Sequence, residues 1–107
     1  MALSRGFSPA QFRDAVLGTV GPVPVSATIP STAAGASTHV EVTVPGVAPG
    51  DMLFVIPAVN PTNGCVIDAS VTAANTVTVY TAVATGGATY NPGAQILTFV
   101  GFRFKTA

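Results

Sequence analysis

The chain has 107 residues, enough for one domain around a single core. Only 7% of its residues are charged and 49% are hydrophobic. A soluble domain usually carries about 25% charged residues. The formal net charge is zero and the four Lys and Arg residues form no basic stripe, which argues against binding to nucleic-acid phosphates. Pro, Gly, Thr or Asn interrupts every apolar run well short of the roughly 20 residues of a spanning helix, so the sequence predicts no membrane span.

Residues 1–22 differ in composition from the rest of the chain. They are predicted to form an N-terminal arm with a short helix, ahead of a β domain over residues 23–107. Ser8 is a typical N-cap, Pro9 fits the first helical position, and Gly18 is expected to end the helix. A helix this short is marginal alone in water, so it must dock either on its own domain or on a neighbouring subunit, and both remain open. The arm also lacks the continuous apolar stretch of a secretion signal.

From Val23 onward, β-branched residues divided by regularly spaced turn residues predict β-strands. Residues 38–44 alternate strictly between Val and polar side chains, as in a half-buried antiparallel strand. The short connection 73–75 favours a hairpin between the strands that flank it. About six strands without a helical period predict an all-β fold, a small antiparallel β-sandwich or barrel. The expected strands are 25–29, 38–44, 52–56, 65–72, 76–80 and 95–105.

Two of these strands are apolar on both faces. Residues 52–56 show no alternation, so both faces of this strand are expected to be covered. One face of a sandwich strand normally meets water. The second apolar face of the last strand is therefore expected to meet either another subunit or the N-terminal helix. The last strand has two rows of side chains, namely Ile96, Thr98, Val100, Phe102 and Phe104 on one face and Leu97, Phe99, Gly101, Arg103 and Lys105 on the other.

The sequence carries no recognisable catalytic or metal-binding pattern. His39 is the only histidine, and it is expected on a solvated strand face beside Glu41, a poor setting for a general base. Cys65 is the only cysteine, so no disulfide within the chain can form, and one Cys with one His cannot make a zinc site. The four carboxylates lie in four different expected elements, and no spacing pairs them for glycoside hydrolysis. We therefore expect a protein that is not an enzyme and holds no cofactor or metal.

Two segments resemble a recurring pattern of small virion proteins of tailed bacteriophages. Residues 42–51 read VTVPGVAPGD and precede the apolar strand 52–56, and residues 69–79 read ASVTAANTVTV ahead of a Gly-containing loop and a closing strand that ends near Phe104. The resemblance covers about residues 38–104 and is to head decoration (cement) and head-fibre proteins. It implies a β-sandwich without catalytic residues, made in the host cytoplasm and located on the capsid surface of the virion.

The resemblance and the scarcity of charge together suggest a structural virion protein, a capsid decoration or cement subunit. Its implied partners are the major capsid protein and copies of itself, as in a trimer, held by apolar burial and strand-edge contacts. The alternative is a fibre or spike head domain that binds a host receptor or glycan, with Tyr80 and Tyr90 as the only tyrosines for an aromatic platform. The residues expected to bind partners are Phe7, Phe12, Val16, Leu17, Phe99, Phe102 and Phe104.

Overall fold

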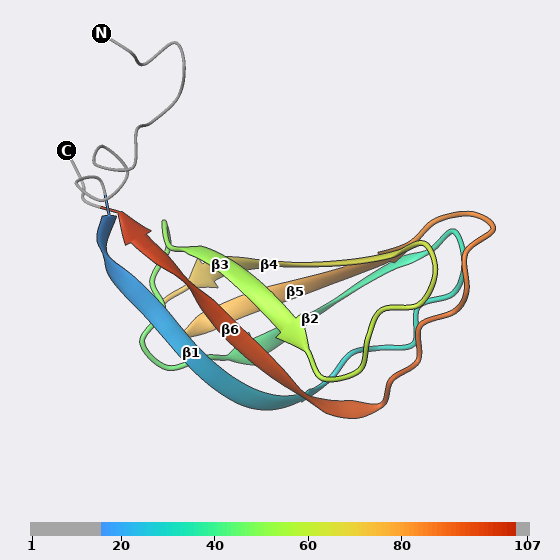
Figure 1. The fold of residues 1–107 in the computed structure, drawn as a ribbon, viewed down its shortest axis with the longest axis horizontal. Helices are drawn as coiled ribbons and strands as arrows, with labels where there is room; N and C mark the ends of the chain where they lie inside the picture. Colours follow the sequence, from blue (N-terminus) through green and yellow to red (C-terminus); the bar gives the residue numbers. More distant parts are fainter. Residues whose placement is uncertain (1–15, 105–107) are drawn as a thin grey trace, which may run out of the picture.

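The computed structural model describes residues 16–104, which form an all-β domain of two layers (Figure 1). The strands pair antiparallel in two three-stranded sheets, ordered β1-β6-β3 and β2-β5-β4. The predicted all-β class and its six antiparallel strands are therefore confirmed. The strands are β1 (Val16–Thr28), β2 (Ser37–Thr43), β3 (Met52–Pro57), β4 (Cys65–Ala73), β5 (Thr76–Val83) and β6 (Ala94–Phe104).

The core lies between the inward-facing rows of the two sheets. Leu97 and Phe99 of β6 and Leu53 of β3 contribute from one sheet, and Val77 and Val79 of β5 contribute from the other. β5 and β6 are the central strands of their sheets, which is why their inner rows are the most deeply buried. The expected division of the last strand is confirmed over its middle, because one row points into this core and the row that contains Ile96 and Thr98 points outward.

The first strand begins earlier than the sequence predicts. A strand was expected only over residues 25–29 after a helix ending at Gly18, but β1 starts at Val16 and pairs with β6 to Thr28. Residues 16–22, assigned to the arm, therefore belong to a strand, and the remainder of the expected helix lies outside the described residues. Pairing with β6 satisfies the backbone hydrogen-bonding groups of this segment, and such tertiary pairing outweighs the small free-energy differences of helix propensity.

A bulge in β1 explains why its alternation was not visible. Val20 pairs with Gly101 and Val23 with Phe99, so β1 has one more residue than β6 between these pairs and both valines face inward. Gly21, in the bulge, has a φ of 76°, and a Cβ there would meet the carbonyl oxygen of Phe99. Only glycine fits this position without strain.

Hydrogen bonds tie the loops together at both ends of the domain. At one end the Tyr90 hydroxyl donates to the carbonyl oxygen of Val59 at 2.6 Å, and the Gln95 amide nitrogen donates to that hydroxyl at 3.0 Å. At the other end the tight β4–β5 hairpin turns at Asn75, whose φ is 60°. The backbone of Asn75 bonds Val44 at 2.9 Å and Val47 at 3.0 Å, which fixes the β2–β3 loop against the confirmed hairpin.

Candidate protein-docking face

The outer face of the β1-β6-β3 sheet carries an exposed row of large apolar side chains. Leu53 and Val55 of β3 face the core, so the strand's alternation places Met52, Phe54 and Ile56 outward. These three side chains are 50%, 54% and 55% exposed, and Ile96 on the neighbouring strand β6 is 46% exposed. We call Met52, Phe54, Ile56 and Ile96 the apolar stripe. The largest apolar patch on a typical soluble monomer covers about 300–600 Å² and is often functional, which makes this stripe a candidate contact site.

No charged side chain interrupts this face. The only charged residue in the described parts of β1, β3 and β6 is Arg103, and its guanidinium pairs with Asp51 at the end of the sheet. The other outward residues of β1 include Pro24 and Ser26, which pair with Thr98 and Ile96 of β6. A surface without charge loses little hydration free energy when another protein covers it. The face is therefore suited to a contact with another protein from which water is excluded.

The outer face of the β2-β5-β4 sheet is more polar, although Val66 on β4 is also exposed there. Tyr80 on the central strand pairs with His39 on one side and Asp68 on the other, so these three side chains form one polar row. The rings of His39 and Tyr80 lie 6.2 Å apart between centroids. The next row contains Glu41 and Ser70. The two faces of one small domain therefore differ in chemistry, and the polar one is suited to remain in water.

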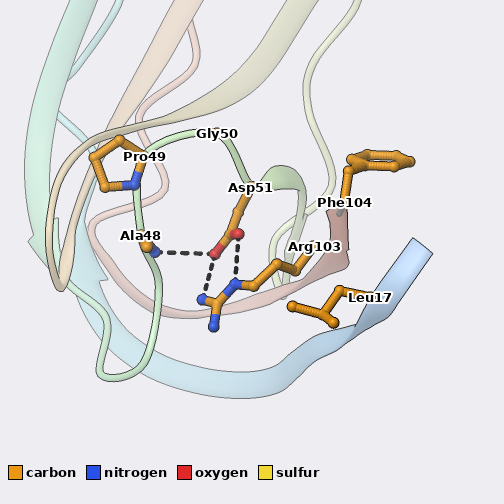
Figure 2. Close-up of a pocket in the computed structure, with 7 residues that line it drawn as sticks. All are labelled: Leu17, Ala48, Pro49, Gly50, Asp51, Arg103 and Phe104. Atoms are coloured by element: carbon orange, nitrogen blue, oxygen red, sulfur yellow. Dashed lines mark hydrogen bonds and ion pairs between the residues drawn. The ribbon is translucent and has the colours of Figure 1, made fainter. Parts of the chain in front are cut away.

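A cleft of about 390 Å³ lies at the end of the domain where the described chain begins and ends. Figure 2 shows Leu17 of β1 and Phe104 of β6 on one side and the β2–β3 loop on the other. The Asp51 and Arg103 side chains point toward each other between these walls. The lining residues are Leu17, Ala48, Pro49, Gly50, Asp51, Arg103 and Phe104.

The ion pair in the cleft is a structural clamp. Both the Nε and one terminal nitrogen of Arg103 donate to the two Asp51 carboxylate oxygens at 2.8 Å, and that terminal nitrogen also donates to the Gly46 carbonyl at 2.8 Å. The backbone nitrogen of Ala48 donates to the same carboxylate at 2.9 Å. These bonds fasten the β2–β3 loop to the end of β6, and both carboxylate oxygens are already engaged. The clamp therefore holds the loop rather than offering a free carboxylate to a ligand.

The clamp makes stability depend on pH. Hydrogen bonding from Arg103 lowers the pKa of Asp51 below its ordinary value, against the opposing effect of burial. The unfolded-state pKa is about 3.9. Because the folded-state pKa is lower, the stabilisation is complete above the unfolded value and is lost as the pH falls through the folded one. Asp51→Asn is expected to lower the free energy of unfolding by about 2 kcal/mol at pH 7 and much less at low pH.

Urea unfolding between pH 2 and pH 7 measures this difference. Asp68→Asn is the matched control, because Asp68 is exposed on the polar face, and we expect it to change stability little. An Asp51→Asn penalty that stayed constant down to the lowest pH would contradict the assignment of the clamp.

The sequence-predicted partner-binding residues do not form one cluster in the structure. Phe7 and Phe12 lie outside the described residues. Val16 begins β1 opposite Phe104, and Leu17 is 63% exposed at the cleft. Phe102 and Phe104 are half-buried on β6, the first in the outward row beside Met52 and the second at the cleft. Val16, Leu17, Phe102 and Phe104 thus sit at one end of the sheet.

Phe99 does not belong to a partner-binding surface. Its side chain is 0% exposed in the core, packed in the row of β6 that faces the other sheet. Listing both Phe99 and Phe102 assigned partner contacts to both apolar faces of the last strand, whereas the core fills the face that carries Phe99.

Sequence reasoning missed the residues of the apolar stripe. The lack of alternation in residues 52–56 indicated cover on both faces, yet among the described residues the outward side chains of β3 remain about half exposed. Ile96 was recognised only as part of a mixed row. The useful signal was the uninterrupted apolar run itself, but the run does not reveal that its strand lies at the edge of a sheet.

The side chains that could act in catalysis or metal binding lie apart from one another. Cys65 pairs with Val83 in the inward row, whereas His39 is exposed on the opposite face of the same sheet, so the two cannot form a thiol–imidazole dyad. Burial raises the pKa of the Cys65 thiol. Across residues 16–104, no three His, Cys, Asp or Glu residues gather where a metal ion could be held. The same part of the chain contains no helix that could cross a membrane.

Comparisons with protein-family models, with curated proteins and with solved structures give no significant match.

Proposed function

We propose that this chain is a structural virion protein, a decoration or cement subunit that stabilises the outer shell of a tailed bacteriophage. The observation that carries the proposal is the contrast between the apolar stripe and the polar row of His39, Tyr80 and Asp68. A subunit of a shell needs one face for its neighbours and another for water. The low charge of the whole chain and its resemblance to small phage head proteins support the same proposal.

The size of the face indicates weak contacts that are repeated many times. Three strands about 4.8 Å apart, with the six residues of β3 at about 3.3 Å each, give a face of about 300 Å². Covering it contributes at most about 7 kcal/mol at about 25 cal/mol per Å² of apolar surface, because the face also carries polar residues such as Ser26 and Thr98. Association costs about 4–15 kcal/mol, so one such contact is near break-even. A symmetric shell multiplies it through avidity.

Particle binding by the full chain tests this proposal. Phe54→Ser removes a half-exposed apolar side chain from the centre of the stripe and is expected to weaken binding at least tenfold, because about 100 Å² of apolar contact is lost. Tyr80→Ser, a change of similar size on the polar face, is the matched control and should leave binding unchanged. The measurement is co-sedimentation of purified chain with particles of the phage that encodes it.

Particle binding at high salt concentration provides a second test of the same proposal. Contacts between uncharged faces should persist at about 1 M salt, where the Debye length is only about 3 Å. Equal binding by the Phe54→Ser and wild-type chains, or release of both at high salt, would count against the apolar face as the docking surface.

The second candidate function is that of a fibre or spike head that binds a receptor or glycan. One of the chain's two tyrosines is buried, since Tyr90 is 1% exposed and its hydroxyl donates a hydrogen bond to the carbonyl oxygen of Val59. Tyr80 favours this candidate, because it is 47% exposed beside His39. The same variants separate the two functions. Loss of glycan or cell binding in Tyr80→Ser, with particle attachment intact, would favour the fibre head.

A further inference from the structure

Each of the two sheets has two edge strands, and within residues 16–104 no further strand pairs with any of them. Proline discourages pairing at an edge, because it has no backbone N–H to donate. β1 contains Pro22 and Pro24, and β3 ends at Pro57. β2 and β4, the edges of the polar sheet, contain no proline, and β4 is the longer, with nine residues against seven. Another strand can therefore be added at β2 or at β4.

Of these two edges, β4 has more apolar surface to bury. On β2 the inward Val42 is already buried, and the outward row contains the polar residues His39 and Glu41. On β4 every apolar side chain of the inward row remains partly exposed, and the outward Val66 is 65% exposed. That inward row consists of Cys65, Ile67, Ala69 and Val71. The hydrophobic gain from an added strand is therefore larger at β4.

The backbone of β4 presents hydrogen-bonding groups along its open edge. In an antiparallel ladder, every second residue directs its N–H and C=O away from the strand it pairs with. Ala69 is such a residue, because its N–H donates at 2.8 Å to the carboxylate of Asp68 and not to β5. Ile67 and Val71 share its phase along the strand. The edge groups of Ile67, Ala69 and Val71 can therefore pair with another strand, once Asp68 releases the central N–H.

The sequence of β4 is nearly symmetric about Ala69. The nearest pair joins an acceptor, Asp68, to a hydroxyl donor, Ser70, and the outermost pair consists of two small residues. Between them lie a pair of β-branched apolar residues and a Val with its isostere Thr. The pairs are Asp68 with Ser70, Ile67 with Val71, Val66 with Thr72, and Cys65 with Ala73. A self-complementary strand of this kind fits a second copy of itself in a two-fold contact.

Charge and side-chain direction select one register for such a contact. Centring the pair on Asp68 would set two carboxylates directly opposite each other, which is destabilising. A shift by one residue would place inward side chains beside outward ones. Centring it on Ala69 places each Asp68 beside Ser70 of the second copy. The Ser70 hydroxyl can then donate to Asp68, which frees the Ala69 N–H for the Ala69 carbonyl of the second copy.

We infer that β4 of one copy pairs antiparallel with β4 of a second copy about Ala69. Residues 67–71, which precede the bulge between Val71 and Ala73, supply about six backbone hydrogen bonds across the two-fold axis. The two three-stranded polar sheets become one continuous sheet. This pairing does not depend on the proposed function of the apolar stripe.

The two-fold axis of an antiparallel strand pair runs perpendicular to the sheet. The same faces of both copies therefore lie on the same side of the dimer. The two apolar stripes would point in one direction and the two polar rows in the other. A particle surface could then contact both stripes at once, which strengthens a contact that is weak when made singly.

A charge swap in the full-length chain tests the pairing. Ser70→Asp sets two carboxylates side by side at both symmetric positions and is expected to weaken self-association about tenfold. Ser37→Asp is the matched control, because Ser37 is exposed on β2, the other edge of the same sheet, and it should leave self-association unchanged. The double variant Asp68→Ser with Ser70→Asp again leaves one carboxylate in each pair and is expected to restore wild-type self-association.

Sedimentation equilibrium measures self-association, and the mass of the wild-type chain should approach twice 10.7 kDa as its concentration rises. A wild-type chain that stays monomeric throughout would overturn the inference. Equal weakening by Ser70→Asp and Ser37→Asp would also overturn it, as would a double variant no better than Ser70→Asp.

Phe54→Ser separates this inference from the proposed function. Pairing through β4 should survive this substitution, because Phe54 lies on the other sheet. A dimer that Phe54→Ser dissociates would place the contact on the apolar stripe and overturn the inference. A monomeric wild-type chain whose particle binding is lost in Phe54→Ser would leave the proposed function standing. A Phe54→Ser chain that still dimerises and binds particles normally would instead support the β4 pairing and reject the proposed function.

Discussion

Replacing Phe99 with Ala is expected to lower the free energy of unfolding by about 4 kcal/mol, the largest effect of any substitution considered for this chain. Phe99 is fully buried on the central strand β6, between Leu97 and Gly101 of the inward row. Removing the ring leaves a cavity between the sheets that the surrounding valines cannot fill, because β-branched side chains have few alternative rotamers.

The measurement is urea-induced unfolding followed by circular dichroism, with Phe54→Ala as the control. Phe54 is the same residue type on the same sheet, but it is about half exposed on the outer face. We expect its loss to cost less than about 1 kcal/mol in the isolated chain. Similar penalties for the two variants would contradict the assignment of Phe99 to the core and restore it to the group of partner-binding residues.

Gly101→Ala is expected to cost about 3 kcal/mol, because the strand has no room for a side chain there. A Cβ on Gly101 would meet the carbonyl oxygen of Met52 and stand 2.9 Å from the Cα of Leu53. These are backbone atoms of β3, which is an edge strand paired only with β6. The strand must therefore move away from β6, and the Met52 end of the apolar stripe moves with it.

The control for this variant is Gly18→Ala. A Cβ on Gly18 would have no neighbour within 4 Å, and its φ is not in the left-handed region. Its effect on the free energy of unfolding should stay within about 0.5 kcal/mol. Thermal unfolding of both variants, together with particle binding, measures the strain and its effect on the stripe. A stable Gly101→Ala chain with wild-type particle binding would contradict the close approach of β3 and β6.

Local patterns in the sequence determined most of the strands and the orientation of their side chains. Alternation in residues 38–44 predicted a half-buried strand, and the structure shows β2 with Val40 and Val42 inward and His39 and Glu41 outward. The short connection that ends at Asn75 predicted the β4–β5 hairpin. These features depend only on the period of two along an extended backbone, which a sequence displays directly.

Only the tertiary structure decided which strands are neighbours and which apolar side chains stay in the open. Whether Phe54 or Val55 enters the core depends on where β3 lies against β6 and the second sheet, and an uninterrupted apolar run contains no period to reveal it. The first part of β1, ahead of residue 25, also escaped prediction, because the bulge at Gly21 breaks the alternation and the pairing with β6 joins residues far apart in the chain. Composition and period-two patterns thus determined an all-β domain with little charge. Strand order and register placed the apolar stripe on one outer face and the polar row on the other, because burial is set by contacts between distant segments.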